Sequence, residues 1–192
     1  MILQFKYWTY KQKLIPSFVF EPLLTIMNEY CTTGTSKRRR SCVFDNIHGK
    51  PMNLSNNIYK NILYYDWKDS TPILHEICNI VEDFTKESYD YVLVHIYGSG
   101  ESGINWHNDS EAMNSPIASI SLGATRKFRF RKINRKIGWD TEIKLNNGDL
   151  VWMHGPNLRT NSISCQNKYY HTIPVEKTIK EPRINLTFRQ YE

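Results

Sequence analysis

The segment "YVLVHIYGSGESGINWHND", residues 91–109, decides the fold of this chain. Its first seven residues are almost all apolar, as expected of a strand that is buried on both faces. His95 and Tyr97 interrupt this run and share a parity, so their side chains point to the same side of the strand. A glycine-rich turn follows, and then His107 and Asp109, which again share a parity. We therefore expect two strands that direct polar side chains to one side.

Short strand-like runs, separated by Gly, Asn, Pro and Lys, fill the rest of this half of the chain. Many closely spaced strands are typical of a sandwich or jelly roll. The first half instead carries two amphipathic segments, Pro22–Tyr30 and Pro72–Phe84, which we expect to be helices packed on the core. In "LNNGDLVW" (145–152) the Asn147-Gly148 pair predicts a β-hairpin turn. The strand-like runs are IASISL (117–122), RKFRFRK (126–132), TEIKL (141–145), DLVWM (149–153), HTIPV (171–175) and RINLTFRQY (183–191).

The 192 residues, 40% of them hydrophobic, suffice for one domain with its own core. No apolar run approaches the roughly 20 residues of a membrane span, and polar residues interrupt the N-terminus before a secretory apolar region can form. Four cysteines without a disulfide framework fit a reducing compartment. We expect an intracellular monomer of the nucleus or cytoplasm, without membrane attachment. Its bias to Asn, Ile, Lys and Tyr is typical of an AT-rich genome, viral or microbial.

Basic residues give the chain a net charge of +6 and a pI of about 9.1. Much of this charge lies in Lys37–Arg40 and Arg126–Lys136. Such runs are typical of contact with a polyanion such as nucleic acid, and equally of a solvated basic face. The 5 Trp, 12 Tyr and 8 Phe residues can stack on flat ligands or pack a core. Composition alone therefore leaves both interpretations open.

The pattern His107-x-Asp109 offers an imidazole and a carboxylate from one strand. His171, at the start of HTIPV, is the best candidate for a second imidazole from a distant strand. Two histidines and one carboxylate on one side of a metal leave coordination positions open, which is diagnostic of non-haem Fe(II) oxygenases. His-x-Asp alone arises often by chance, so the hypothesis depends on the complete set. Three other histidines are less well placed, in a loop, within a helix and at a sheet exit: His48, His75 and His154.

The last strand alternates apolar residues at positions 184, 186 and 188 with polar ones. Taken alone, this is an amphipathic strand whose polar side faces water. Together with the polar sides of the two strands described above, it could line one shared cavity in a small barrel. The polar residues are Arg183, Asn185, Thr187 and Arg189.

Five motifs, in this order, resemble the AlkB family of Fe(II)/2-oxoglutarate-dependent dioxygenases, and most of all its nucleic-acid demethylase branch. They are "WHNDSE", "SPIASISLGATRKFRFR", "LNNGDLVWM", "YYHTIP" and "PRINLTFRQ". The likeness is dense from about residue 91 to 191 and thin before residue 70. It implies an α+β fold in a single dioxygenase domain over 1–192. A double-stranded β-helix (jelly-roll) core over about 89–192 would be braced by N-terminal helices and a nucleotide-recognition lid within about 1–88.

The resemblance also implies roles for individual residues. His107, Asp109 and His171 would be the catalytic iron ligands. Arg183 would bind the distal carboxylate of 2-oxoglutarate, because a planar guanidinium pairs with a carboxylate through two hydrogen bonds. Arg189 would help to hold the carboxylate near the iron. The other residues expected at the cosubstrate are Asn185, Tyr97 and His95.

Two features depart from the family pattern. His95 stands where the family usually has asparagine, and an imidazole could still donate to the cosubstrate. The segment between Met153 and His171 is longer than usual, and could be a lid, a substrate-contacting loop or a neutral insertion. On the substrate side, the resemblance suggests an acidic residue near the flipped base, a lid strand and aromatic contacts: Glu111, Arg39, Arg40, Phe44, Tyr59 and Trp106.

The reaction implied by the resemblance is oxidative demethylation of bases such as 1-methyladenine and 3-methylcytosine in DNA, RNA or both. Its products are formaldehyde, succinate and CO2, and its cofactor and cosubstrates are Fe(II), 2-oxoglutarate and O2. Two alternatives remain open. One is the same dioxygenase class acting on a protein or lipid. The other is a nucleic-acid-binding module in which His95 has impaired cosubstrate binding and catalysis.

Overall fold

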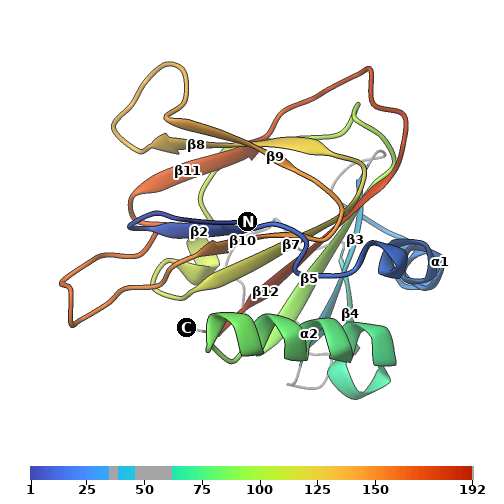
Figure 1. Cartoon of the computed structure of the whole chain (residues 1–192). Helices are drawn as coiled ribbons and strands as arrows, with labels where there is room; N and C mark the ends of the chain where they lie inside the picture. Colours follow the sequence, from blue (N-terminus) through green and yellow to red (C-terminus); the bar gives the residue numbers. More distant parts are fainter. Residues whose placement is uncertain (35–38, 46–61, 192) are drawn as a thin grey trace.

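The computed structural model describes residues 1–34, 39–45 and 62–191, which form two facing β-sheets braced by helices (Figure 1). Helices α1 and α2 pack on one face of the larger sheet, and the smaller sheet covers the other face. This arrangement confirms the expected α+β fold with a jelly-roll core. The helices are α1 (Phe20–Tyr30) and α2 (Pro72–Thr85), with short 3-10 turns η1 (Ser17–Val19), η3 (Trp67–Asp69) and η4 (Ser110–Ala112).

The larger sheet has the strand order β1-β2-β10-β7-β12-β5-β3-β4 among the described residues. Its neighbouring strands are antiparallel except β3 and β4, which are parallel. The last strand of the chain, β12, therefore lies in the middle of the sheet, between β7 and β5. The strands are β1 (Ile2–Gln4), β2 (Trp8–Lys11), β10 (Asp149–Met153), β7 (Ile117–Gly123), β12 (Arg183–Arg189), β5 (Tyr91–Tyr97), β3 (Arg39–Asp45) and β4 (Leu63–Asp66).

The smaller sheet has the order β6-β11-β8-β9. It packs on the larger sheet through a cluster that includes Trp8, Phe128, Phe130 and Met153. Its strands are β6 (Ile104–His107), β11 (Tyr169–Ile173), β8 (Arg126–Lys132) and β9 (Thr141–Leu145).

Helix α2 begins as its sequence predicts. The Thr71 hydroxyl accepts a hydrogen bond from the Leu74 amide at 3.3 Å, and Pro72 occupies the first turn. Leu74, Ile77 and Val81 are buried against the larger sheet. Within the described ranges, no helix is long and apolar enough to cross a membrane.

The hairpin predicted at Asn147-Gly148 is wrong. Strand β9 belongs to the smaller sheet and β10 to the larger one, so this turn connects the two sheets. Gly148 does adopt a positive φ of 86°, as the turn chemistry requires. The carboxylate of buried Asp149, however, accepts hydrogen bonds from the Tyr10 hydroxyl and the Lys13 amide, which tie the turn to the segment of β2. An Asn-Gly pair specifies a backbone conformation and not the partner of the strand that follows.

Strand β12 is buried along its whole length, so its polar side does not face water. Its apolar residues face the helices, and its polar residues face the space between the two sheets. The ordinary amphipathic interpretation of this strand is therefore wrong, and the shared-cavity interpretation is confirmed.

Candidate active site

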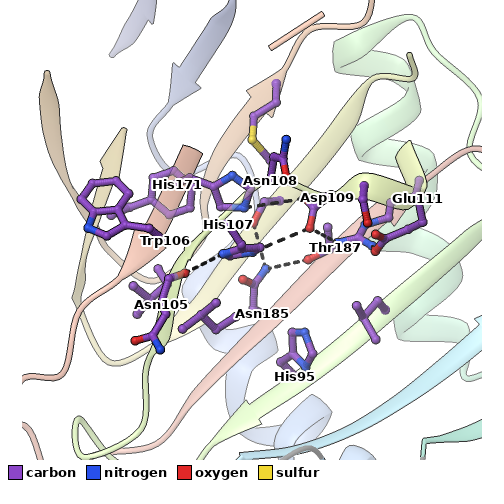
Figure 2. Close-up of a pocket in the computed structure, with 18 of the residues that line it drawn as sticks. His95, Asn105, Trp106, His107, Asn108, Asp109, Glu111, His171, Asn185 and Thr187 are labelled. Atoms are coloured by element: carbon purple, nitrogen blue, oxygen red, sulfur yellow. Dashed lines mark hydrogen bonds and ion pairs between the residues drawn. The ribbon is translucent and has the colours of Figure 1, made fainter. Parts of the chain in front are cut away.

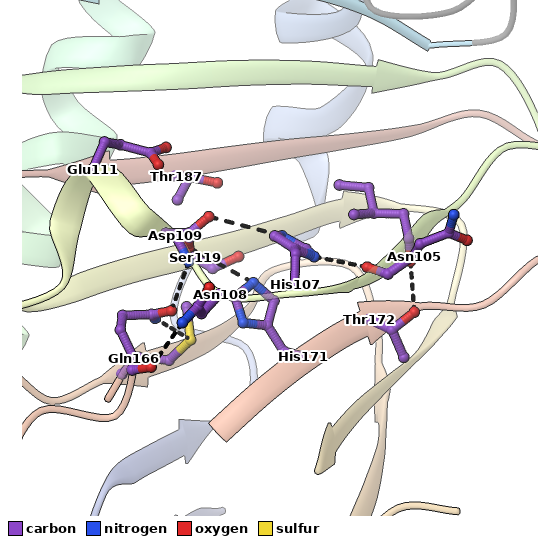
Figure 3. A network of polar contacts seen from close by, with 12 residues as sticks. Asn105, His107, Asn108, Asp109, Glu111, Ser119, Gln166, His171, Thr172 and Thr187 are labelled. Carbon is purple, nitrogen blue, oxygen red and sulfur yellow. Dashed lines mark hydrogen bonds and ion pairs between the residues drawn. The ribbon is translucent and has the colours of Figure 1, made fainter. Parts of the chain in front are cut away.

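Three potential metal ligands converge between the sheets (Figure 3). His107 ends β6, Asp109 follows it, and His171 lies opposite His107 in the neighbouring strand β11. The ligand atoms of the three residues all lie within 4.8 Å of one another. The Nε2 atoms of His107 and His171 are 3.7 and 3.6 Å from the two oxygens of Asp109. This set has the composition of a facial triad and could hold a divalent metal ion.

The two imidazoles are prepared to act as ligands. The Nδ1–H group of His107 donates to the Asn105 carbonyl at 2.8 Å, which leaves Nε2 free for a metal. Burial lowers the pKa of His171 well below its ordinary value, so this ring is neutral. Phe128 stacks on the ring of His171 at 5.5 Å between centroids. Neutral, oriented imidazoles are the form that binds metal.

Asp109 is fixed through both its backbone and its carboxylate. Its amide donates to Oε1 of Gln166 at 2.9 Å, and its Oδ1 accepts from Nη2 of Arg189 at 2.8 Å. Arg189 also pairs with Glu111 through Nη1. Charge-assisted hydrogen bonds of this kind restrict where a carboxylate can point. Arg189 therefore lies beside the metal-ligand cluster, as expected, but its guanidinium contacts Asp109 directly.

Sequence reasoning missed Gln166. It is 1% exposed and lies in the long segment before His171, which joins β10 to β11. The Gln166 side chain holds the Asp109 amide and also donates from Nε2 to Met153 Sδ at 3.3 Å. The Gln166 backbone carbonyl accepts from Asn108 Nδ2 at 3.3 Å. The length and polarity of this segment were the only signal. No spacing rule singles out one glutamine within it.

A cavity of about 260 Å³ adjoins the three ligands (Figure 2). Its walls come from both sheets and from strands far apart in the sequence. The predicted residues Trp106 and Glu111 line it as well, and the Trp106 indole lies beside the Arg131 guanidinium at 4.4 Å. The other predicted residues that line it are Arg39, His95, Asn185 and Arg189.

Arg183 and Tyr97 lie opposite each other on β12 and β5. Each lies two residues along its strand from Asn185 or His95 and therefore on the same face. Arg183 and Tyr97 are not among the residues that line the cavity. Burial lowers the pKa of Arg183 to about 10. Within the described part of the chain, Arg183 Nη1 and the Tyr97 hydroxyl are buried without a hydrogen-bond partner. A carboxylate would satisfy both donors, so these residues fit the dicarboxylate 2-oxoglutarate.

The structure places two residues predicted for the lid strand away from the cavity. Strand β3 is built into the larger sheet beside β5, and its alternate residues face opposite sides. Phe44 is fully buried on the helix side, 5.1 Å from the ring of Tyr30, and Arg40 on the same side donates to Asn28 of α1. Of Arg39, Arg40 and Phe44, only Arg39 lines the cavity. Tyr59, together with Lys37 and Arg38, lies outside the described residues.

The first arginine of the basic run 126–136 is also not a phosphate contact. Arg126 is 1% exposed, and its guanidinium donates to the carbonyls of Ser102 and Pro174 at 2.8 and 2.7 Å. It joins the turn after β5 to the end of β11. A buried cation with these partners stabilises the fold.

The comparisons with known proteins agree with this geometry. A family model described as the 2OG-Fe(II) oxygenase superfamily matches residues 24–189. The chain belongs to this superfamily. Membership implies Fe(II), 2-oxoglutarate and O2 as cofactor and cosubstrates, which the cluster of His107, Asp109 and His171 fits.

The chain is also similar in sequence to individual proteins of the AlkB family. The chain is 36% identical over 122 residues to the Bos taurus "DNA oxidative demethylase ALKBH2". This match covers 62% of this chain and 43% of that protein. The chain is 34% identical over 128 residues to the Bos taurus "Alpha-ketoglutarate-dependent dioxygenase alkB homolog 3", covering 62% and 42%. The chain thus spans less than half the length of these relatives. The solved structure of OsALKBH1 shares the fold over 100% of both chains, with a TM-score of 0.68 and 14% identity.

Proposed function

We propose that this oxygenase is an oxidative demethylase of N-alkylated bases, of the 1-methyladenine and 3-methylcytosine type, in DNA or RNA. The observation that carries the proposal is the convergence of His107, Asp109 and His171 at a cavity that lies beside buried arginines. Relatives named as DNA oxidative demethylases support the substrate class. The iron centre would oxidise an N-methyl group at the expense of 2-oxoglutarate and O2, giving succinate, CO2 and formaldehyde.

The protein's own residues would position the reactants. His107, Asp109 and His171 would hold the metal. Arg183 and the Tyr97 hydroxyl would bind one carboxylate of 2-oxoglutarate, because each has a buried donor without a partner among the described residues. The protein thereby orients the cosubstrate and keeps water from its charged end.

The outer face of the smaller sheet supports contact with a nucleic acid strand. There the guanidinium of Arg131 lies 4.4 Å from the Trp106 ring and 5.9 Å from the Tyr170 ring, and Arg129 lies 3.8 Å from Trp139. Interleaved cations and aromatic rings suit a strand of phosphates and stacked bases. Trp106 also lines the cavity, so this surface is continuous with the site. We call Arg129, Arg131, Trp106, Trp139 and Tyr170 the outer-face cluster.

Glu111 and Arg39 would contact the extruded nucleotide at the mouth of the cavity. Glu111 pairs with Arg189, which in turn contacts Asp109. A base bound to Glu111 would thus be connected to Asp109 through Arg189. A bound base that donates a hydrogen bond to Glu111 would thus be held in register with the metal ligands.

The proposal is tested by following methyl loss with mass spectrometry from short DNA and RNA oligonucleotides that carry 1-methyladenine or 3-methylcytosine. The expected result is methyl loss that requires 2-oxoglutarate and disappears in His107→Ala. Succinate formation without methyl loss would instead favour a protein or lipid substrate. Absence of both products, with oligonucleotide binding intact, would favour the impaired binding module.

A further inference from the structure

The polar side chains at the cavity wall differ in the hydrogen bonds they can still give. Asn185 Nδ2 donates to Ser119 Oγ at 2.9 Å and to the Ile120 carbonyl at 3.0 Å, while its Oδ1 accepts from Arg183 Nη2 at 3.2 Å. Asn185 thus joins β12 to β7 and orients Arg183. Both protons of its amide are engaged within the protein, so a ligand beside Asn185 needs a neutral donor from a neighbouring residue.

His95 is placed to supply it. In the sheet register it lies between Asn185 on β12 and Ser41 on β3. His95 is 7% exposed and lines the cavity (Figure 2). Nδ1 lies 2.6 Å from the Ser41 hydroxyl oxygen. Among the described residues, Nε2 has no hydrogen-bond partner.

The environment of Ser41 decides which ring nitrogen carries the proton. Ser41 is fully buried, and the contact of its hydroxyl within the described ranges is with His95 Nδ1. A buried hydroxyl proton needs an acceptor, so Ser41 donates and Nδ1 accepts. Burial, followed by the charges of Arg39, Arg189 and Arg183, lowers the pKa of His95 well below its ordinary value. The ring is neutral, and its single proton is therefore on Nε2.

We propose that Ser41 fixes His95 as the Nε2–H tautomer and that this N–H group donates to a carboxylate of 2-oxoglutarate. A carboxylate only accepts hydrogen bonds, so the opposite tautomer would present a lone pair to an anion and repel it. Ser41 is a positioning residue, which acts through His95. The inference rests on the cosubstrate of the proposed function and is independent of its nucleic-acid substrate.

The test measures 2-oxoglutarate affinity of the Mn(II)-loaded protein by calorimetry, without nucleic acid. His95→Phe, which has no donor, should weaken binding about tenfold, and Ser41→Ala, which frees the tautomer, about three- to tenfold. His95→Asn should remain within about threefold of the wild type, because its amide supplies an N–H donor. Mn(II) affinity should not change in any variant, which shows that the metal ligands remain in place.

The double variant Ser41→Ala/His95→Asn separates tautomer control from loss of structure. An asparagine needs no tautomer to be fixed, so the double variant should bind 2-oxoglutarate as His95→Asn does. If it instead loses the affinity that Ser41→Ala loses, Ser41 acts on the fold and the inference is wrong.

Nitrogen-15 NMR of the histidine rings in the Zn(II)-loaded protein tests the tautomer directly. The His95 signals, identified by their loss in His95→Asn, should show a protonated Nε2 in the wild type and a mixture in Ser41→Ala. A protonated Nδ1 in the wild type would overturn the inference, as would unchanged affinity in both His95→Phe and Ser41→Ala. Normal 2-oxoglutarate binding without demethylation of any oligonucleotide would overturn the proposed substrate and leave this inference standing.

Discussion

At the scale of single residues, the site depends on how Asp109 is held. Its amide is fixed by Gln166, in the connection between β10 and β11, and its carboxylate by Arg189, at the end of β12. Residues that orient a metal ligand without touching the metal commonly change metal affinity 10- to 100-fold when removed. We therefore expect Gln166 to influence metal binding through Asp109, although only the length and polarity of its segment point to it in the sequence.

We expect Gln166→Ala to weaken Mn(II) binding by about tenfold or more, because the Asp109 amide loses its acceptor and the carboxylate loses its orientation. Calorimetric titration of the apoprotein with Mn(II) measures this. The exposed Asn161→Ala in the same connecting segment should bind Mn(II) as the wild type does. Equal affinity in Gln166→Ala and the wild type would show that Arg189 alone holds Asp109.

The buried histidines predict how apoprotein stability depends on pH. Burial lowers the pKa of His95 and of His171 in the folded state, whereas the unfolded chain takes up protons near pH 6.5. The unfolded state therefore binds more protons in mildly acidic solution, and the free energy of unfolding should fall as pH decreases below about 6.5. Urea unfolding at about pH 7.5 and pH 5.5 measures this loss, which should be smaller in His95→Asn. A loss of equal size in His95→Asn would mean that His95 is charged in the fold.

At the scale of elements, the turn between β9 and β10 fixes the relative position of the two sheets. Gly148 has a φ of +86°, and a Cβ atom there would lie 2.0 Å from the Ile15 carbonyl oxygen. Gly138 has a similar φ of +76°, but a Cβ atom there would meet only the end of the Arg135 side chain, at 3.9 Å. Substitutions at these two glycines can therefore separate the cost of a positive φ from the cost of a steric clash.

We expect Gly148→Ala to lower the free energy of unfolding by well over 2 kcal/mol, and Gly138→Ala by only about 1 kcal/mol, the cost of a positive φ for alanine. Urea unfolding of the two variants measures the difference. Similar values for both would show that the Ile15 segment moves away without cost.

The elements show what sequence patterns could and could not predict. The capped helix α2 and the strand β12 follow from local periodicity, because each pattern encodes its own secondary structure. The pairing of β10 with β2 does not follow, because the two strands lie more than a hundred residues apart and no local pattern connects them. The sequence does not fix the parity of β3, and a shift of one residue reverses the face, so the position of Arg40 and Phe44 on the helix side could not be predicted.

The candidate metal ligands His107, Asp109 and His171 could be predicted, because their chemistry follows from residue type and spacing. The contacts of Arg189 with Asp109, and of Ser41 with His95, could not be predicted, since they need the register between strands. Tyr59 stays a prediction, as does the monomeric state.

At the scale of the whole molecule, the outer-face cluster would present part of the net charge of +6 to a nucleic acid strand. We expect Arg131→Gln to weaken binding of a single-stranded oligonucleotide and to reduce the salt dependence of its affinity by nearly one unit of log–log slope, the effect of about one phosphate contact. Fluorescence anisotropy over a range of salt concentrations measures both. Lys86→Gln, which removes an exposed charge at the end of α2, is the control and should leave the slope unchanged. The same slope for Arg131→Gln and the wild type would show that the bound oligonucleotide does not contact Arg131.

The measurement that tests the central claim most directly is an anaerobic titration of the apoprotein with Fe(II) and 2-oxoglutarate, followed by visible absorption of the iron–cosubstrate complex. We predict that the wild type forms this complex and that Asp109→Ala does not. Arg183→Lys should need about tenfold more 2-oxoglutarate or more, because a point charge does not replace the planar guanidinium, whereas Arg135→Lys should behave as the wild type. No complex in the wild type, or an unchanged one in Asp109→Ala, would contradict the assignment of this cavity as an Fe(II)/2-oxoglutarate site.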